Sequence, residues 1–566
     1  MKLKMTGAQL IVQLLEAQDV ELVTGIPGGA LLPLYEALGG DTRIRHVLAR
    51  HEQGAGFIAQ GLARVSGRAA VCLGTSGPGA TNLVTAIADA KLDSVPLVCI
   101  TGQVPQHLIG TDAFQEVKTT HIVETITKAN FMVRSAAELI DLIPEAFRIA
   151  ETGRPGPVLI DVPKDVQREI IEVDATRLPR RAARIAEAPD AIAITMAAEL
   201  IAQARKPVLY LGGGVIKSGG SMAARKLAER ASLPTTTTLM ALGALPSDHA
   251  LNIGMLGMHG AHSANRIIDE CDLLIAVGAR FDDRATGRTD AFAPNARVIH
   301  IDADRREFGK IRKPTLAIEA DARLALEALC EAVSADARPQ WIARMRAIQG
   351  EHPCEWHAPQ HEVRSPYGLI QAVAKLAGDD AVITTDVGQH QMWVAQAYPF
   401  RRPDRWLTSG GLGTMGFGLP AAIGAALMEP DATVVCFTGD GSLLMNVQEF
   451  ATLADLQCNV KIVLLDNASL GMVRQQQHLF HRRRYLGSSF ERPTEFCSVA
   501  RAFGIPALDL GASSDPLAIL EEAFATPGPA LIRVPIHADR QVMPMVAPGG
   551  SNVELVSASA KREVMQ

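Results

Sequence analysis

Two polar side chains, Asp440 and Asn467, follow apolar segments of the chain at residues 433–437 and 460–465. Both segments are typical of buried parallel strands, and the 27 positions between the two side chains leave room for one helix and a return. One strand–helix–strand unit therefore brings a carboxylate and an amide oxygen to the same sheet edge. Such oxygens beside a helix N-terminus suit a hard cation that bridges a diphosphate. The alternative is two ordinary strand ends with turn residues, and the presence of both halves at this spacing argues against it.

The paired pattern resembles the signature of thiamine-diphosphate enzymes, in which the aspartate and the asparagine hold Mg2+ and the metal holds the diphosphate. This resemblance implies that Asp440 and Asn467 are metal ligands and that the main-chain carbonyl of Ser469 is the next ligand. It also implies that the neighbouring turn residues contact the diphosphate. Those residues are Gly439, Gly441 and Ser442.

Glu52 follows a predicted strand that begins near Ile44, and it starts a helix rich in small residues. One interpretation is a solvated glutamate that complements the helix dipole. Beside the metal pattern a functional interpretation is favoured, because thiamine needs one carboxylate that exchanges a proton with N1′ of its aminopyrimidine. We expect few polar neighbours around Glu52, which would raise its pKa and allow it to share that proton.

Other candidate residues stand at glycine-rich turns. Met415 lies among glycines that allow a ligand to approach the backbone, although a lone methionine is usually a core residue. Arg280 and Arg284 follow a strand-to-glycine transition and suit a second phosphate ligand, or else form a surface salt-bridge cluster with Asp282 and Asp283. Arg154, Lys164, Phe114 and Gln115 are weak indications when each is taken alone.

Length and composition limit the class of protein. The chain has 566 residues with 48% hydrophobic content, which predicts several globular domains. Its net charge of −6 does not indicate the basic surface that binds nucleic acid. We see no apolar run long enough to span a membrane, and the N-terminus is typical of a first helix and not of an export signal. The eight cysteines form no CxxC pair, so we expect neither a zinc site nor a disulfide framework, and a cytoplasmic protein.

Apolar strand-like runs alternate with helical periods throughout, which predicts an α/β fold. Residues 170–192 and 334–366 interrupt this pattern with prolines and charges and are interpreted as linkers. We therefore expect three consecutive doubly wound parallel-sheet domains of the thiamine-diphosphate-binding fold. The pyrimidine-binding domain spans residues 1–170, the FAD-binding domain 190–335 and the diphosphate-binding domain 365–545.

Over nearly all of its length the chain resembles the catalytic subunits of the acetohydroxyacid synthase (acetolactate synthase) family, and most of all the bacterial isozyme-I type. The motifs that carry the resemblance include PGGALLP, ARHEQGAGFIAQG, SGPGATNLVTAIADA, GRPGPVLIDVPKDV, GMLGMHG, GARFDDR and TSGGLGTMGFGLPAAIGAA. It implies a reaction that decarboxylates pyruvate and condenses the remaining unit with pyruvate or 2-oxobutyrate, at the start of valine, leucine and isoleucine biosynthesis. The implied cofactors are thiamine diphosphate, Mg2+ and FAD, and in this family FAD performs no net redox chemistry.

The resemblance also assigns residues to roles. Arg284 would bind the carboxylate of the second oxo acid, Glu52 would serve the cofactor of another subunit, and Met415 would bend the cofactor. The second-substrate pocket would include Gly29, Phe114, Gln115 and Lys164. Further contacts to the thiamine cofactor would come from Val387, Gly388, Gln389, His390 and Gly413. FAD would be held by Arg154, Gly212, Gly213, Gly214, Met258, His259, Gly278, Arg280, Asp302 and Asp321.

One departure from the family pattern concerns specificity. Where the family usually has tryptophan beside the second-substrate site, this chain has Gln476. A glutamine offers less apolar contact to the extra methyl group of 2-oxobutyrate, so we expect only a weak preference for that substrate. A second departure is Asp466, where asparagine is common, but Asn467 is retained and the metal site is expected to survive.

Three other functions were weighed. An FAD-dependent pyruvate oxidase has the same domain plan, but the GMLGMHG and GARFDDR motifs with Arg284 favour the synthase. A regulatory protein without catalysis is disfavoured because Glu52, Asp440 and Asn467 are all present, and a glyoxylate carboligase is disfavoured by Glu52. The family works as homodimers or homotetramers, usually with a small regulatory subunit. Residues 481–485 suit a mobile lid and a solvated loop equally.

Overall fold

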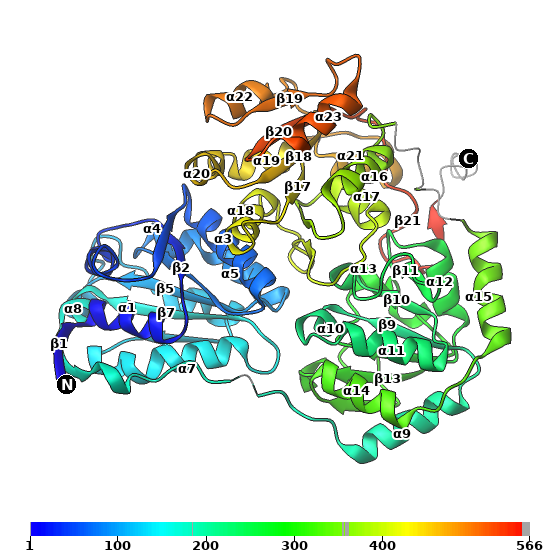
Figure 1. Ribbon diagram of the computed structural model, residues 1–566, viewed down its shortest axis with the longest axis horizontal. Coiled ribbons are helices and arrows are strands. Elements are labelled where there is room, and N and C mark those ends of the chain that lie inside the picture. The colour runs from blue at the N-terminus through cyan, green and yellow to red at the C-terminus, as the bar shows by residue number, and fades with distance from the viewer. Residues whose placement is uncertain (1, 184, 354–355, 357–361, 557–566) are drawn as a thin grey trace.

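The computed structural model describes residues 2–183, 185–353, 356 and 362–556. Three domains follow one another along the chain and meet near the centre of the molecule (Figure 1). The N-terminal domain lies at the left, the middle domain at the lower right and the C-terminal domain at the top. Each is built on a six-stranded parallel sheet, which confirms the predicted α/β fold with three consecutive parallel-sheet domains.

The N-terminal sheet has the strand order β3-β2-β4-β5-β7-β6, and its neighbouring strands β5 and β7 are buried along their whole length. Helices on both faces explain that burial. The strands are β2 (Leu22–Gly25), β3 (Arg45–Leu48), β4 (Ala70–Gly74), β5 (Leu97–Gln103), β6 (Ala129–Met132) and β7 (Pro157–Pro163). The helices are α1 (Gly7–Ala17), α2 (Leu32–Leu38), α3 (Glu52–Ser66), α4 (Pro78–Asn82), α5 (Val84–Leu92), α6 (Thr119–Val123), α7 (Leu139–Glu151) and α8 (Lys164–Arg168).

The middle sheet has the order β11-β10-β9-β12-β13-β14, so successive strands are added on one side of β9 up to β11 and on its other side from β12 onward. At such a switch point the loops after neighbouring strands separate and leave a crevice for a ligand. The strands are β9 (Pro207–Leu211), β10 (Thr235–Thr237), β11 (Asn252–Met255), β12 (Leu273–Val277), β13 (Arg297–Asp302) and β14 (Leu316–Glu319). The helices are α9 (Ala191–Gln203), α10 (Gly213–Lys217), α11 (Ser221–Ala231), α12 (His262–Glu270), α13 (Asp283–Thr286), α14 (Ala322–Ala332) and α15 (Pro339–Glu351).

The C-terminal sheet has the order β16-β15-β17-β18-β20-β19, with β17 and β18 at its centre. Both central strands are fully buried, as their apolar sequences predict. The strands are β15 (Val382–Thr385), β16 (Trp406–Leu407), β17 (Val434–Gly439), β18 (Val460–Asp466), β19 (Ala507–Asp509) and β20 (Ala530–Pro535). The helices are α16 (Pro366–Ala377), α17 (Gln389–Ala397), α18 (Gly418–Met428), α19 (Asp440–Leu443), α20 (Glu449–Leu456), α21 (Gly471–Phe480), α22 (Phe496–Ala502) and α23 (Pro516–Ala525). A short antiparallel pair, β21 (Met545–Val546) and β22 (Leu555–Val556), follows.

Helices α3 and α18 join the N-terminal domain to the C-terminal domain by close packing. A Cβ added at Gly61 of α3 would overlap the carbonyl oxygen of Ala421, and one added at Gly424 of α18 would overlap the carbonyl oxygen of Ile58. Only glycine allows the two backbones to approach this closely. The small residues of α3 therefore serve an interface between domains.

Two expectations about local structure were wrong. The N-terminus begins with a strand, β1 (Lys2–Thr6), which pairs antiparallel with β8 (Ile170–Asp174), and only then does α1 start. The expected linker 170–192 thus opens with a paired strand. The expected linker 334–366 contains α15, because Pro339 occupies the first turn, where proline is tolerated, and Trp341 and Met345 bury one face of the helix. Residues 354–355 and 357–361 of that segment lie outside the described residues.

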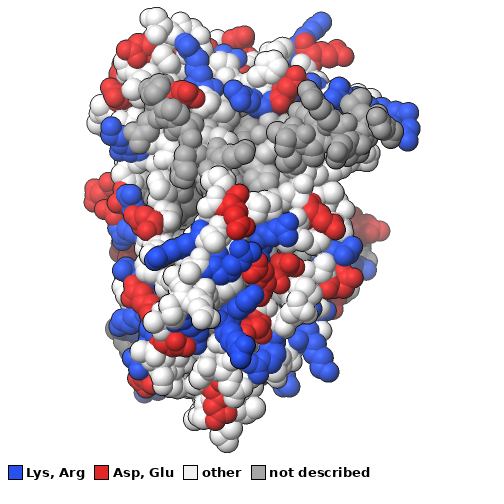
Figure 2. All heavy atoms as spheres, turned by 90° about the vertical axis from the view of Figure 1, so that its right-hand side faces the viewer, with Lys and Arg blue, Asp and Glu red and all other residues white. Residues whose placement is uncertain are grey.

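Acidic and basic side chains are interspersed over the face shown in Figure 2. Arg344 of α15, for example, forms ion pairs with Glu270 and Glu351. The described part of the chain contains no helix with the length and apolarity needed to cross a membrane. Seven cysteines within it are free thiols, and five of these are buried.

Candidate active site

A cavity of about 690 Å³ lies where the three domains meet. Segments from the carboxyl ends of strands in the middle and C-terminal sheets supply most of its wall, as expected for open parallel sheets. Every residue predicted to bind a cofactor or the metal lies on this wall, together with Arg284 and Gln476. The structure therefore gathers residues from position 154 to position 476 around one space.

The predicted metal ligands converge at the adjacent ends of β17 and β18. The amide N–H of Ser469 donates to Oδ2 of Asp440 at 3.0 Å and to Oδ1 of Asn467 at 3.1 Å. Both ligand oxygens thus lie within hydrogen-bond distance of one backbone nitrogen. Asp440 also accepts from the N–H of Gly441 at 3.0 Å and begins α19, so its carboxylate stands at a helix start.

The electrostatics of this corner favour a cation. Burial and the nearby Asp466 raise the pKa of Asp440 to about 7. A divalent ion would favour the ionised form and offset both effects. Asp466 is in turn held by Arg533, whose Nε donates to its Oδ2 at 2.7 Å. Among the described residues no group of three or more His, Cys, Asp and Glu side chains is arranged to hold a metal ion. The donors here are one carboxylate, one amide and main-chain oxygen, which suit Mg2+.

The turn after β15 lies on the other side of the predicted metal site at the ends of β17 and β18. Gly388 has a φ of 153°, and α17 begins at Gln389. The first residues of this helix line the cavity, and the N–H groups of a first helical turn have no partner within the helix. The Nε2 atom of His390 is buried and has no hydrogen-bond partner among the described residues. Burial lowers the pKa of His390 to about 3, so its ring is neutral. A buried polar atom without a partner beside these N–H groups fits an anionic ligand with several oxygens.

Met415 lies in the loop between β16 and α18. Gly413 and Gly416 on either side of it have φ values of 68° and 88°, which glycine adopts without strain. The N–H of Gly416 donates to Oδ1 of Asp386 at 2.6 Å and fixes the end of the loop. A Cβ added at Gly441 would lie 3.7 Å from Cε of Met415, so the methionine tip lies beside the metal-binding turn.

The predicted flavin residues line the part of the cavity formed by the middle domain. A Cβ at Gly212 would overlap the carbonyl of Gly278, so the turns after β9 and β12 are in backbone contact. This contact leaves an open backbone surface for a ligand. Burial raises the pKa of Asp302 to about 6, and Asp321 caps α14 through the N–H groups of its first turn.

The remaining polar groups on this side have partners within the chain. Nη1 of Arg154 pairs with Oε1 of Glu307 at 2.6 Å. His259 is buried, which lowers its pKa to about 4, and its Nδ1 lies 3.3 Å from the carbonyl oxygen of Pro544. Arg284 is largely exposed and lies near Asp283, with 3.7 Å between Nε and Oδ2.

Five predicted catalytic residues lie off the cavity wall, and all five belong to the N-terminal domain. Glu52 is buried at the start of α3 and accepts a hydrogen bond from Nδ2 of Asn82 at 2.9 Å. Phe114 is 88% exposed, which is unusual for a large apolar side chain. The other three are Gly29, Gln115 and Lys164.

Sequence reasoning missed a segment of the cavity wall, residues 92–94, at the C-terminal end of α5. It also missed Asp89 of the same helix. The two aspartates, Asp89 and Asp93, are spaced one helical turn apart and are buried, and buried aspartates require partners. Apart from Arg64, those partners stand more than 300 positions later in the chain, at residues 409–414, so no local pattern indicates them.

Comparison with known proteins identifies the class. Three domain families match: the N-terminal TPP binding domain of thiamine pyrophosphate enzymes over residues 5–122, their central domain over 194–329, and their C-terminal TPP binding domain over 386–534. The chain belongs to the thiamine pyrophosphate enzyme family.

Curated relatives narrow this further. The chain is 56% identical to the acetolactate synthase isozyme 1 large subunit of Escherichia coli, over 98% of both chains. It is 45% identical to the acetolactate synthase large subunit of Corynebacterium glutamicum, over 99% of this chain and 91% of the relative. It is also 45% identical to the isozyme 2 large subunit of Escherichia coli, over 98% of this chain and 99% of the relative. Within the thiamine enzymes it is a member of the acetolactate synthase large subunits.

Proposed function

We propose that this chain decarboxylates pyruvate and joins the two-carbon unit to a second 2-oxo acid, either pyruvate or 2-oxobutyrate. This is the first common step of valine, leucine and isoleucine biosynthesis. The observation that carries the proposal is that the predicted metal ligands, Arg284 and Gln476 line the same cavity. One space that holds both a thiamine site and a carboxylate-binding arginine suits a carboligation better than a simple decarboxylation.

Bound thiamine diphosphate supplies an electron sink for the pair of electrons left when CO2 departs. In our proposal Asp440, Asn467 and the carbonyl of Ser469 hold Mg2+, and the N–H groups that begin α17 hold diphosphate oxygens. Nε2 of His390 is a neutral partner for the same oxygens. Met415 supports the cofactor from the loop beside Gly441.

The second 2-oxo acid is held by residues at the edge of the cavity. The guanidinium of Arg284 is largely exposed, and its partners among the described residues are the carboxylate of Asp283 and Sδ of Met258, each at 3.7 Å, so it is available to a substrate carboxylate. Gln476 faces the same space from α21. An amide there discriminates weakly between a methyl and an ethyl group, because little apolar area contacts the extra carbon.

A second copy of the chain completes this site in our proposal. Glu52, which would exchange a proton with the aminopyrimidine, does not line the cavity of its own chain, and neither do Gly29, Phe114, Gln115 and Lys164. The exposure of Phe114 supports a contact with another subunit. We infer a homodimer or homotetramer, and the words "large subunit" in the relatives' names support a small regulatory partner.

FAD is the ligand that we assign to the middle-domain side of the cavity. Backbone contact between the turns at Gly212 and Gly278 leaves room for an extended ligand, as in other dinucleotide sites. Its role is structural, because carboligation of two 2-oxo acids involves no net oxidation.

One assay tests this function. Purified protein is incubated with pyruvate, thiamine diphosphate, Mg2+ and FAD while acetolactate and oxygen consumption are measured together. Acetolactate without matching oxygen uptake is the expected result. Oxygen uptake with release of acetate or acetyl phosphate would instead identify a pyruvate oxidase, and the role of Arg284 would be withdrawn.

A further inference from the structure

Residues 92–94 form a junction between the domains. The carbonyl of Leu92 accepts from Nη1 of Arg280 at 2.5 Å, and the carbonyl of Asp93 accepts from Nζ of Lys217. Both cationic side chains belong to the middle domain and line the cavity where the flavin is assigned. Oγ of Ser94 accepts from Nε of Arg154 at 2.8 Å. Main-chain and side-chain oxygens of three successive residues thus hold two predicted flavin residues, Arg154 and Arg280, and a third basic side chain on the same wall, Lys217.

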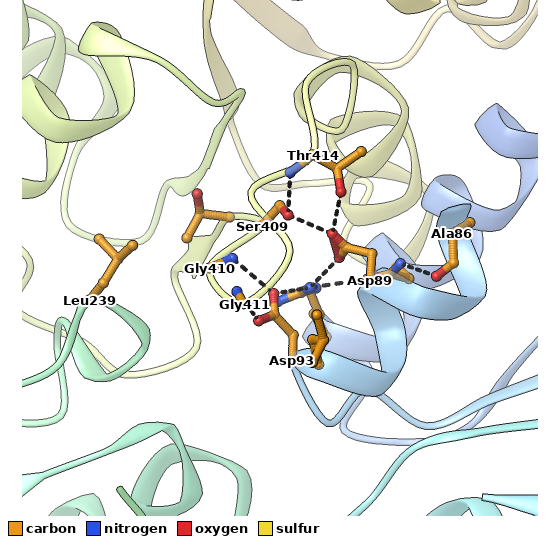
Figure 3. Close-up of polar contacts among 12 residues, drawn as sticks. Ala86, Asp89, Asp93, Leu239, Ser409, Gly410, Gly411 and Thr414 are labelled. Carbon is orange, nitrogen blue, oxygen red and sulfur yellow. Dashed lines mark hydrogen bonds and ion pairs between the residues drawn. The ribbon is translucent and has the colours of Figure 1, made fainter. Parts of the chain in front are cut away.

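The side chain of Asp93 points toward the C-terminal domain (Figure 3). Its Oδ2 accepts from the N–H of Gly410 at 3.0 Å, and its Oδ1 accepts from the N–H of Gly411 at 2.7 Å. Nη2 of Arg64 donates to Oδ2 at 2.8 Å, which balances the buried charge. A carboxylate that accepts two successive backbone N–H groups fixes the position and the orientation of that backbone.

Asp89 holds the same loop from one turn earlier on α5. Its Oδ2 accepts from Oγ of Ser409 at 2.5 Å and from Oγ1 of Thr414 at 3.1 Å. Residues 409–414 are therefore fixed at both ends by a helix of another domain (Figure 3). This loop contains Gly413 and leads directly into Met415, which are assigned to the thiamine cofactor.

We propose that Asp93, supported by Asp89, is a positioning residue that couples the flavin site to the thiamine site. Its carboxylate sets the loop that leads into Met415, and its carbonyl sets Lys217 in the flavin site. A cofactor that orders one end of this junction lowers the cost of ordering the other end. Each cofactor then raises the affinity for the other by the same factor, because coupling between binding sites is reciprocal. The inference rests on the proposed assignment of the two cofactor sites.

The test measures cofactor binding, not turnover. The Kd for FAD is determined from flavin fluorescence with and without saturating thiamine diphosphate and Mg2+. In the wild-type protein we expect thiamine diphosphate to lower this Kd by about fivefold or more, which is the usual lower range of coupling between sites. In Asp93→Asn, where an NH2 group replaces one acceptor of the loop N–H groups, we expect the ratio of the two Kd values to fall close to one.

Three further variants make the result specific. Asp379→Asn, an exposed carboxylate paired with Arg401 in the C-terminal domain, is the matched control and should keep the wild-type ratio. Thr414→Val removes the hydroxyl contact to Asp89, and Ser409→Ala removes its contact to Asp89 together with the hydrogen bond that it accepts from the N–H of Thr414, so each should lower the ratio partially. These two variants also carry the test if Asp93→Asn does not fold.

A merely structural role would lower the melting temperature and weaken both cofactors without changing the ratio. A wild-type ratio near one, absence of FAD binding, or a ratio that Asp93→Asn, Ser409→Ala and Thr414→Val all leave unchanged would overturn the proposal. The acetolactate assay is independent of this outcome. A protein that shows the coupling but makes no acetolactate would refute the proposed function and leave the coupling in place.

Discussion

The middle and C-terminal domains bring their predicted ligand-binding residues to one shared cavity, whereas the N-terminal domain keeps its predicted catalytic residues away from it. The difference does not come from fold, because all three domains have six-stranded parallel sheets. It comes from which face each domain presents to the rest of the chain. The N-terminal domain uses α3 and α5 for contacts with the C-terminal domain, and the residues around Phe114 remain exposed. The comparison teaches that one chain gathers its predicted metal, diphosphate and flavin residues around one cavity but leaves the predicted catalytic residues of its N-terminal domain outside it.

The largest expected effect follows from removing the N-terminal carboxylate. Glu52→Gln should lower kcat for acetolactate formation by about 10²–10⁴-fold, the usual contribution of a proton-transfer group. The Kd for thiamine diphosphate is measured alongside, so that a loss of catalysis is separated from a loss of cofactor binding. The exposed Glu124→Gln is the control. More than about a tenth of wild-type activity in Glu52→Gln would remove this residue from the chemistry.

A mixing experiment tests directly whether Glu52 of one subunit and Asp440 of another form one active site. Co-expression of Glu52→Gln chains with Asp440→Asn chains should recover activity up to about a quarter of wild type in a symmetric dimer. Half of the randomly formed dimers are mixed, and one of the two sites in each mixed dimer has both native residues. Activity that stays at the level of the separate variants would place both residues in the same chain's site.

A substitution at Gln476 tests which residue of the cavity determines the choice between 2-oxobutyrate and pyruvate. Gln476→Trp should raise the preference for 2-oxobutyrate over pyruvate by about tenfold, because a flat apolar wall gains contact with the extra methyl group. The measurement is a competition assay with both 2-oxo acids present. A strong preference in the wild-type protein, or an unchanged ratio in the variant, would show that Gln476 does not contact the second substrate.

The smallest expected effect concerns Asp161, a buried residue of the N-terminal domain that does not line the cavity. Burial raises the pKa of Asp161 to about 7, despite hydrogen bonds from Thr101 and Gln103. Because the folded state binds this proton more tightly than the unfolded state, the contribution of Asp161 to stability falls as pH rises from about 4 to about 7. Asp161→Asn cannot ionise, so its melting temperature relative to wild type should rise over that window by about 4 °C or more.

Differential scanning fluorimetry between about pH 4 and about pH 7 measures this difference. Asp455→Asn, which alters an exposed ion pair with Arg50, provides the control and should show no comparable trend. A melting-temperature difference between Asp161→Asn and wild type that stays constant with pH would mean that Asp161 remains ionised in the folded protein.

The sequence predicts those parts of the site that depend on strand ends. Asp440 and Asn467 follow apolar runs, and parallel strands place such residues at one edge by geometry alone. The domain plan follows in the same way from the alternation of apolar runs and helical periods. A strand at residues 2–6 was missed although Leu3 and Met5 alternate with lysines, because the segment is short and its partner β8 lies far along the chain.

Contacts between distant segments could not be predicted. Asp89 and Asp93 look like ordinary charges on a helix until residues 409–414 are placed beside them. The helix α15 was missed because prolines on both sides of it suggested a linker, while the buried face of Trp341 and Met345 is defined only by tertiary packing. The exposure of Phe114 likewise depends on which surface the folded chain leaves open.

The glycine contact between α3 and α18 has a consequence for biosynthesis. Gly61 and Gly424 are about 360 positions apart, so at about 5–20 residues per second the ribosome delivers α18 roughly 20–70 s after α3. During that interval the nascent N-terminal domain exposes the small, apolar face of α3 and the aspartates of α5 without their partners. The packing of α3 against α18 therefore waits until α18 has been translated. A truncated product that ends before α18 would present a surface that chaperones and proteases recognise.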